Sequence, residues 1–101
     1  FPHVAGLRYR WDPSRPAGSR VLRVEVRGAD STYAPLADER IYRLVSNKFL
    51  RRGGDGYEVL RDNAIDAYDF GPVLADAAVA YLAAYSPIAP QREGRISRHG
   101  E

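Results

Sequence analysis

The chain contains no cysteine, so neither a disulfide framework nor a thiolate metal site can form within it. Its two histidines, His3 and His99, stand at opposite ends, and no D-x-H or N-H-E run accompanies them. A two-metal phosphoesterase needs a cluster of His, Asp and Asn ligands. G-x-S-x-G elbows, P-loops and Cys–His pairs are absent as well. The sequence therefore predicts no catalytic residue, metal ligand or cofactor site in this chain.

Long apolar runs and a strong charge of one sign are also missing. No stretch approaches the length of a membrane span, and no signal peptide is visible. The net charge is only +2 and the basic residues are scattered, which indicates solvated faces, so no nucleic-acid partner is expected. What is present, 101 residues of which 45% are hydrophobic, predicts a single domain over residues 1–101 with a modest core. Because the chain opens with Phe1 rather than Met, we expect it to be a piece of a longer protein.

Alternating apolar and charged residues predict two strands near the N-terminus. Residues 7–11 and residues 22–26 both have the period of a half-buried strand. Residues 12–18, with two prolines and a glycine, favour a loop, so the strands should form an antiparallel hairpin with a longer connection. The polar segment 28–39 is predicted to be a loop.

Further strands are expected at three places along the chain. Residues 41–46 and 57–60 have aromatic and branched content on either side of a glycine-rich segment, and residues 94–97 are predicted to form a last strand. The remainder, with His99, is expected to be a frayed tail.

One helix is predicted over about residues 72–86. Pro72 suits its first position, and Pro87 disfavours helical geometry just before it. An apolar stripe recurs at helical spacing, formed by Leu74, Ala78, Tyr81, Leu82 and Tyr85. Because Asp76 is its only charge, the helix should be mostly enclosed. The predicted fold class is α+β, a mixed and largely antiparallel sheet packed with this main buried helix.

The segment that carries binding chemistry surrounds Asp55, which is flanked by Gly53, Gly54 and Gly56 and preceded by Phe49. One interpretation is a hairpin turn, because Asp-Gly is a strong turn dipeptide, with Phe49 in the core. The other is a nucleoside clamp, in which the ring stacks on a base and the carboxylate accepts hydrogen bonds from ribose hydroxyls. Taken alone, these residues favour the hairpin.

A resemblance supports the clamp. The run N-x-F-L-x-x-G-G-D-G-Y over residues 47–57 resembles the signature of the C-terminal domain of the 5'-nucleotidase family, which includes UDP-sugar hydrolases and 2',3'-cyclic-phosphodiesterases. Gly-Leu-Arg-Tyr at 6–9 ahead of residues 12–21, and Gly-Arg-Ile at 94–96, resemble other parts of that domain in the same order. The similarity thus spans nearly the whole chain, as the latter part of the family's C-terminal domain.

The resemblance also implies roles for individual residues. Phe49 is similar to one of two aromatic rings that sandwich the base, the other lying upstream of this chain, and Asp55 is similar to the acid that binds the ribose hydroxyls. The implied substrate-binding set is Asn47, Phe49, Gly53, Gly54, Asp55 and Gly56. Lys48, Arg51 and Arg52 depart from the family pattern, which bears on which substrate binds.

The implied whole protein is a hydrolase that releases phosphate from nucleotides. Its upstream metallophosphoesterase domain, absent here, would hold two divalent metal ions, so this fragment alone should be inactive. The implied partners of this chain are a nucleotide or nucleoside and its own N-terminal domain. The implied location is periplasmic, secreted or at the cell surface.

Two alternatives remain. One is a single-stranded nucleic-acid module in which Phe49 and Tyr57 stack on bases while Arg51, Arg52 and Arg61 contact phosphates. The other is a domain that keeps the family fold without nucleotide binding.

Overall fold

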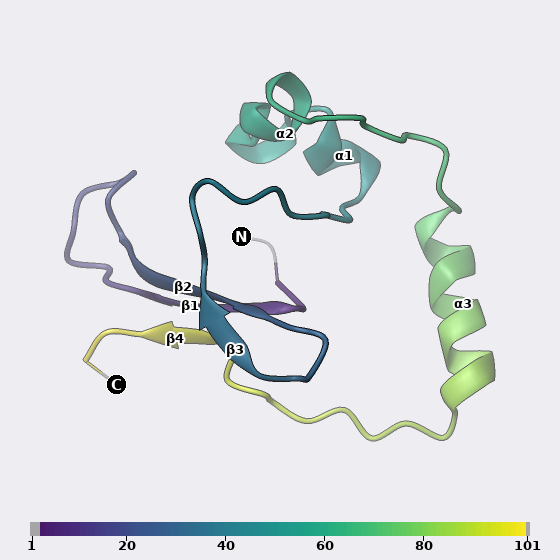
Figure 1. The fold of residues 1–101 in the computed structure, drawn as a ribbon. Coiled ribbons are helices and arrows are strands. Elements are labelled where there is room, and N and C mark those ends of the chain that lie inside the picture. The colour runs from purple at the N-terminus through teal and green to yellow at the C-terminus, as the bar shows by residue number, and fades with distance from the viewer. Residues whose placement is uncertain (1–2, 101) are drawn as a thin grey trace. The chain divides into compact units, whose positions relative to one another are not determined.

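The computed structural model describes residues 3–100 of the chain. They form two compact units. The first is built from the described residues up to Ile41 together with those from Gln91 onward, and it contains the strands. The second, Tyr42–Pro90, contains the helices (Figure 1).

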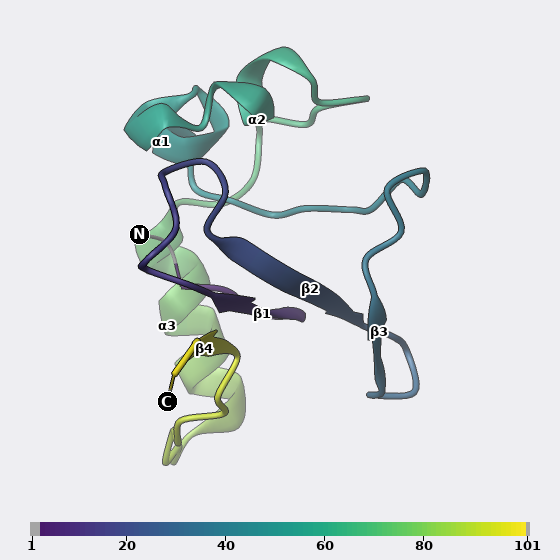
Figure 2. The same ribbon diagram turned by 90° about the vertical axis from the view of Figure 1, so that its left-hand side faces the viewer.

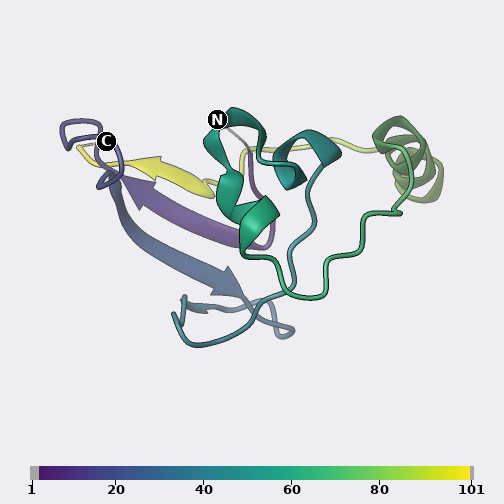
Figure 3. The same cartoon turned by 90° about the horizontal axis from the view of Figure 1, so that it is seen from above.

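The first unit is one four-stranded sheet with the strand order β3-β2-β1-β4. Its strands are β1 (Leu7–Trp11), β2 (Val21–Arg27), β3 (Tyr33–Pro35) and β4 (Ile96–Arg98). β1 pairs with β2 and β2 with β3 in antiparallel fashion, whereas β4 joins β1 in parallel (Figure 3). The prediction of an α+β fold with a mixed, largely antiparallel sheet is therefore confirmed.

The predicted hairpin of β1 and β2 is also confirmed. Leu7 pairs with Val26 and Tyr9 with Val24, so the apolar residues of the two alternating patterns meet on the same face of the sheet. The connection is held at its base by the Asp12 carboxylate, which accepts hydrogen bonds from the hydroxyl and the backbone N–H of Ser14, at 2.6 and 2.9 Å. The same two bonds lower the pKa of Asp12.

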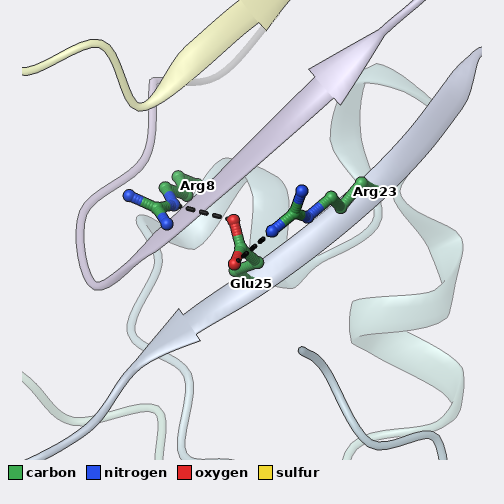
Figure 4. A network of polar contacts seen from close by, with 3 residues as sticks. All are labelled: Arg8, Arg23 and Glu25. Atoms are coloured by element: carbon green, nitrogen blue, oxygen red, sulfur yellow. Dashed lines mark hydrogen bonds and ion pairs between the residues drawn. The ribbon is translucent and has the colours of Figure 1, made fainter. Parts of the chain in front are cut away.

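A charged cluster joins β1 and β2, and Figure 4 shows its three residues, Arg8, Arg23 and Glu25. Glu25 on β2 is 8% exposed, and it is the one residue in the described part of the chain that is buried. Its carboxylate accepts hydrogen bonds from Arg8 Nε and Arg23 Nη2, each at 2.8 Å, and these bonds hold the pKa of Glu25 below its usual range. The Arg8 guanidinium lies 4.2 Å from the centre of the Tyr33 ring of β3. Polar pairing, rather than an apolar core, thus occupies the protected part of this unit.

The prediction that residues 28–39 form only a loop is wrong, because β3 lies within them. Asp30 Oδ1 accepts hydrogen bonds from the backbone N–H and the hydroxyl of Thr32, and Gly28 N donates to the Thr32 carbonyl at 2.8 Å. These local bonds turn the chain back on itself. Tyr33 is thereby brought into register with Arg27 on β2.

The strand predicted at 41–46 does not form, and this segment has no regular structure. Ile41, Leu44 and Val45 are 75%, 62% and 91% exposed. Branched side chains favour a strand only where a neighbouring strand and a covered face receive them. Within the described residues, segment 41–46 has neither a strand to pair with nor a covered face, so its preference for a strand does not produce one.

The strand predicted at 94–97 is present two residues later, as β4, and it is anchored at both ends. Tyr9 N donates to the Arg95 carbonyl at 2.8 Å, and His99 N donates to the Trp11 carbonyl at 2.7 Å. The expectation of a frayed tail is therefore wrong at His99, because its backbone continues the ladder along β1.

The predicted helix is α3 (Leu74–Tyr85), which begins two residues after the expected start and ends just before Ser86 and Pro87, as predicted. The expectation that it is buried is wrong: none of its residues is buried, and Leu74 and Tyr81 are 71% and 57% exposed. The alanine-rich sequence forms the helix through local propensity, but burial needs a second apolar surface. Figure 2 shows α3 as a single continuous helix. Within residues 3–100, no helix combines the length and apolar character needed to cross a bilayer.

Candidate functional site

The glycine-rich segment folds as two short helices joined by a tight turn, and α1 and α2 lie side by side (Figures 1 and 2). Its elements are α1 (Lys48–Arg51), the 3₁₀ turn η1 (Gly54–Gly56) and α2 (Glu58–Asp62). The strand predicted at 57–60 is therefore wrong, and so is the hairpin interpretation, because helices flank the turn. Glu58 in the first turn of α2 and Arg61 in its last are placed favourably for the helix dipole.

Asn47 fixes the start of α1. Its side-chain Oδ1 accepts a hydrogen bond from the Leu50 backbone N–H at 2.9 Å, which is the bond of a helix N-cap. Its own backbone carbonyl accepts from Arg51 N at 3.1 Å. The Asn47 side-chain oxygen thus caps the helix that carries Phe49 and helps to fix the position of that residue.

Phe49 is 59% exposed, so it is not a core residue. Its ring lies against Gly54: a Cβ added to that glycine would stand 2.6 Å from the ring Cζ and 2.7 Å from Cε1 and Cε2. Such contacts are far inside ordinary carbon–carbon separations, so only glycine fits beneath the ring. The close approach holds an aromatic face in a defined place while leaving much of it open to solvent.

Three left-handed residues make the turn between the helices. Gly53 has φ 92° and Gly56 has φ 81°, and between them Asp55 adopts φ 55° and ψ 29°. Left-handed geometry costs a non-glycine residue about 1–2 kcal/mol, although Asp tolerates it better than most. No hydrogen bond or ion pair joins the exposed Asp55 carboxylate to another residue within 3–100. Ser31 and Asp66 also have positive φ, so the backbone geometry of Asp55 does not by itself assign it a function.

An open hollow of about 480 Å³ lies beside the Phe49 ring. It is lined by Lys48, Phe49, Arg52, Gly53 and Gly54. Three of the six residues predicted for substrate binding therefore share one surface, whereas Asn47, Asp55 and Gly56 are not part of its lining. Asp55 follows Gly54 directly, so its carboxylate is carried by the turn that seats the ring.

A second, smaller hollow of about 130 Å³ adjoins the same helix. Its lining residues are Lys48, Arg51, Arg52, Arg61 and Asp69. Arg51 Nε pairs with Asp69 Oδ1 at 3.0 Å, and another of its nitrogens donates to the Leu60 carbonyl at 3.0 Å.

Arg61 makes two hydrogen bonds to the carboxylate of Asp62, at 2.8 and 3.2 Å. These bonds raise the pKa of Arg61 and lower the pKa of Asp62. Arg61 also lies close to Gly53, where an added Cβ would be 3.4 Å from its Nη1. Arg51 and Arg61 are thus committed to carboxylates, whereas Lys48 and Arg52 have no acidic partner within residues 3–100.

Lys48 and Arg52 are the residues that the predicted set leaves out. Both line the larger hollow together with Phe49. A signal for them was present in the sequence, because they stand where the family pattern carries other residue types, but their place in the lining depends on the helix that brings them next to the ring. No group of three or more His, Asp or Glu residues within residues 3–100 is arranged to hold a metal ion.

Comparison with known proteins gives consistent matches over the chain. The family described as "5'-nucleotidase, C-terminal domain" matches residues 1–62. A 5'-nucleotidase of Diplobatis ommata is 34% identical over 95% of this chain and 17% of its own length. A snake venom 5'-nucleotidase of Crotalus adamanteus is 33% identical, covering 92% of this chain and 16% of its own length.

Among solved structures, the 5'-nucleotidase precursor from Thermus thermophilus superposes with a TM-score of 0.85 at 43% identity. The alignment covers 96% of this chain and 19% of that protein. The chain thus spans less than a fifth of the length of each of these proteins.

Proposed function

The chain belongs to the family of the 5'-nucleotidase C-terminal domain, and from this we propose that its residues 47–57 recognise the base and ribose of a nucleotide. The observation that carries the proposal is the Phe49 ring, which is 59% exposed and seated on a glycine that leaves no room for a side chain. A planar apolar face presented in this way suits stacking with a nucleobase. Base–aromatic stacking contributes about 1–3 kcal/mol to binding and tolerates different bases, because every base has a π-face.

Asp55 is proposed to bind the ribose. An ionised carboxylate is an acceptor only, and paired hydroxyls are donors that match its two oxygens. The left-handed backbone of Asp55 keeps this acceptor on the turn that supports the ring. A substrate held by these two residues would have its base and sugar fixed, so binding energy remote from the phosphate would position the phosphoryl group for reaction elsewhere.

We propose that the chain acts as one part of a longer nucleotide-hydrolysing enzyme. Its longer relatives carry the name 5'-nucleotidase, and its own described residues offer no cluster for metal ions. In the proposed protein, an upstream metallophosphoesterase domain would hold two divalent metal ions, which supply the phosphate-releasing chemistry, and this chain would supply binding. A periplasmic, secreted or cell-surface location is proposed with it, in keeping with a relative from snake venom.

The single-stranded nucleic-acid alternative has less support. Two of the three arginines that it needs at phosphates, Arg51 and Arg61, are paired with Asp69 and Asp62. Binding of a single-stranded oligonucleotide that weakens steeply with added salt would support this alternative.

Adenosine titrated into the chain and followed by NMR chemical shifts tests the proposal directly. The Phe49→Ala variant should bind about 5- to 150-fold more weakly, the equivalent of about 1–3 kcal/mol. Asp55→Ala should abolish the preference for adenosine over 2'-deoxyadenosine. Phe70→Ala removes a ring that is 83% exposed outside the hollow and serves as the matched control, with unchanged affinity expected. In the longer protein, the Phe49 and Asp55 variants should lower kcat/KM for nucleoside monophosphates.

Folded Phe49→Ala and Asp55→Ala variants with the affinity and kinetics of the unaltered protein would refute the proposed function. A chain that binds no nucleoside while the longer protein turns over normally with both variants would favour the alternative of a family fold without nucleotide binding.

A further inference from the structure

Resting on the proposed function, we propose that Lys48 and Arg52 make the site selective for nucleotides with a 6-oxopurine base, guanine or hypoxanthine. Both side chains line the hollow beside the Phe49 ring. They stand four residues apart on α1 and its C-cap, a spacing that places two side chains on the same helix face. The hollow thus combines one aromatic face with two cationic groups beside it.

Lys48 and Arg52 differ from the nearby arginines in having no carboxylate partner in the described part of the chain. Arg51 and Arg61 are held by Asp69 and Asp62. Lys48 and Arg52 make no side-chain hydrogen bond or ion pair to another residue in the described chain, so their N–H groups remain free for a ligand. Arg52 is held only through its backbone, whose N–H donates to the Lys48 carbonyl at 3.0 Å.

The chemistry of the base edge decides which ligand these donors accept. Lysine and arginine side chains donate hydrogen bonds and accept none. A base that stacks on Phe49 would share the hollow with Lys48 and Arg52, which also line it, so its edge would be the part that these side chains meet. Guanine offers two adjacent acceptors there, N7 and O6, and hypoxanthine offers the same pair. Adenine replaces the second acceptor with an amino group, which would meet the cations donor to donor.

A free phosphate would also attract two cations, but it does not account for the rest of the hollow. The lining includes the Phe49 ring and two glycines, which give an anion no hydrogen-bond donor from a side chain. In the proposed function the phosphoryl group of the substrate points to the upstream domain, which leaves the base edge as the part that meets Lys48 and Arg52.

Isothermal titration of the chain with guanosine, inosine and adenosine tests the inference. Guanosine and inosine should bind on the order of tenfold more tightly than adenosine. In the Lys48→Ala/Arg52→Ala variant this ratio should fall to about one, chiefly because guanosine and inosine bind more weakly, since alanine keeps α1 helical and leaves the stacking ring in place. Lys48→Arg should retain the preference, since it retains a donor. Arg43→Ala removes an exposed cation outside the hollow, so it should change neither the affinity for any of the three nucleosides nor the ratio between them.

Each other outcome has a defined meaning. Nucleosides that bind through Phe49 without a base preference, or with a preference that survives the double substitution, overturn this inference and leave the proposed function standing. Displacement of guanosine by inorganic phosphate, lost in the double variant without any difference among bases, also overturns it and identifies an anion site. If neither the chain nor the longer protein binds a nucleoside, both proposals fall together.

Discussion

Replacing Gly54 with alanine isolates the feature on which nucleotide recognition is proposed to depend, the seat of the Phe49 ring. The added Cβ would stand 2.6 Å from the ring Cζ. Ordinary carbon–carbon contacts lie at about 3.5–4.0 Å, so the ring must retreat by about 1 Å. Because the ring is 59% exposed, it can swing toward solvent rather than displace the helices.

The expected effect on stability is small. Overpacking a well-filled site costs about 1–3 kcal/mol, but here an exposed side chain can yield. Gly54 does not have a left-handed backbone, so alanine is compatible with its conformation and gains about 0.4–1 kcal/mol by restricting the unfolded chain. The net change in the free energy of unfolding should therefore stay within about 1 kcal/mol, measured by circular dichroism on heating.

The expected effect on binding is large. When the Phe49 ring is displaced, the adenine base loses the surface on which it is proposed to stack. The affinity for adenosine should therefore fall by about 5- to 150-fold, toward that of the Phe49→Ala variant. In the Phe49→Ala background, Gly54→Ala should have no further effect, because no ring remains to collide with it. Gly71→Ala is the control, since nothing lies within 4 Å of its added Cβ. Unchanged adenosine affinity in folded Gly54→Ala would refute the claim that the ring must rest on this glycine.

Two further substitutions test one local interaction in each unit. Asn47→Ala should speed amide hydrogen exchange at Leu50, because loss of an N-cap costs about 1 kcal/mol; Asn47→Asp should keep the protection, and equal exchange in all three proteins would contradict the cap. The pKa of Glu25 is lower in the folded chain because Arg8 and Arg23 donate hydrogen bonds to its carboxylate. Ionised Glu25 therefore stabilises the fold at pH values above the pKa of a free glutamate, about 4.3. This stabilisation is lost as the pH falls through the lower pKa that Glu25 has in the folded chain. Thermal scans between neutral and acidic pH should therefore show Glu25→Gln less stable at pH 7 and converging with the unaltered protein in acid, whereas a constant difference would contradict the linkage.

The parts of the fold that the sequence predicted are those in which local pattern and tertiary pairing agree. Residues 7–11 and 22–26 alternate between apolar and charged side chains, and Leu7 and Tyr9 pair with Val26 and Val24. The end of α3 follows from Pro87, a purely local constraint. By contrast, β3 is only three residues long and depends on the Asp30–Thr32 turn, and residues 41–46 had strand propensity without a strand to pair with. Burial of α3 was inferred from its apolar composition, which says nothing about whether a covering surface exists.

The candidate site was predicted in its residue types more than in its geometry. Gly54 and Phe49 were identified together, and the structure explains why glycine is needed under the ring. The elements around them differ from the prediction, because a glycine cluster beside an Asp-Gly dipeptide suits a hairpin turn as well as the turn between two helices that the structure shows. In the sequence, Lys48 and Arg52 stand out only as departures from the family pattern. Their place beside the ring follows from helical spacing, which requires α1 to be recognised as a helix first.

The parallel pairing of β4 with β1 has a consequence for how this protein can vary. Since β3 and β4 belong to one sheet, residues 42–90 leave that sheet and return to it, as an insertion between two of its strands. The entropy of closing such an excursion grows slowly, by about 0.6 kcal/mol for each doubling of its length. Changes in the length or sequence of this segment can therefore leave the hydrogen bonds of the sheet intact, so the proposed ligand preference could change with little effect on the stability of the sheet.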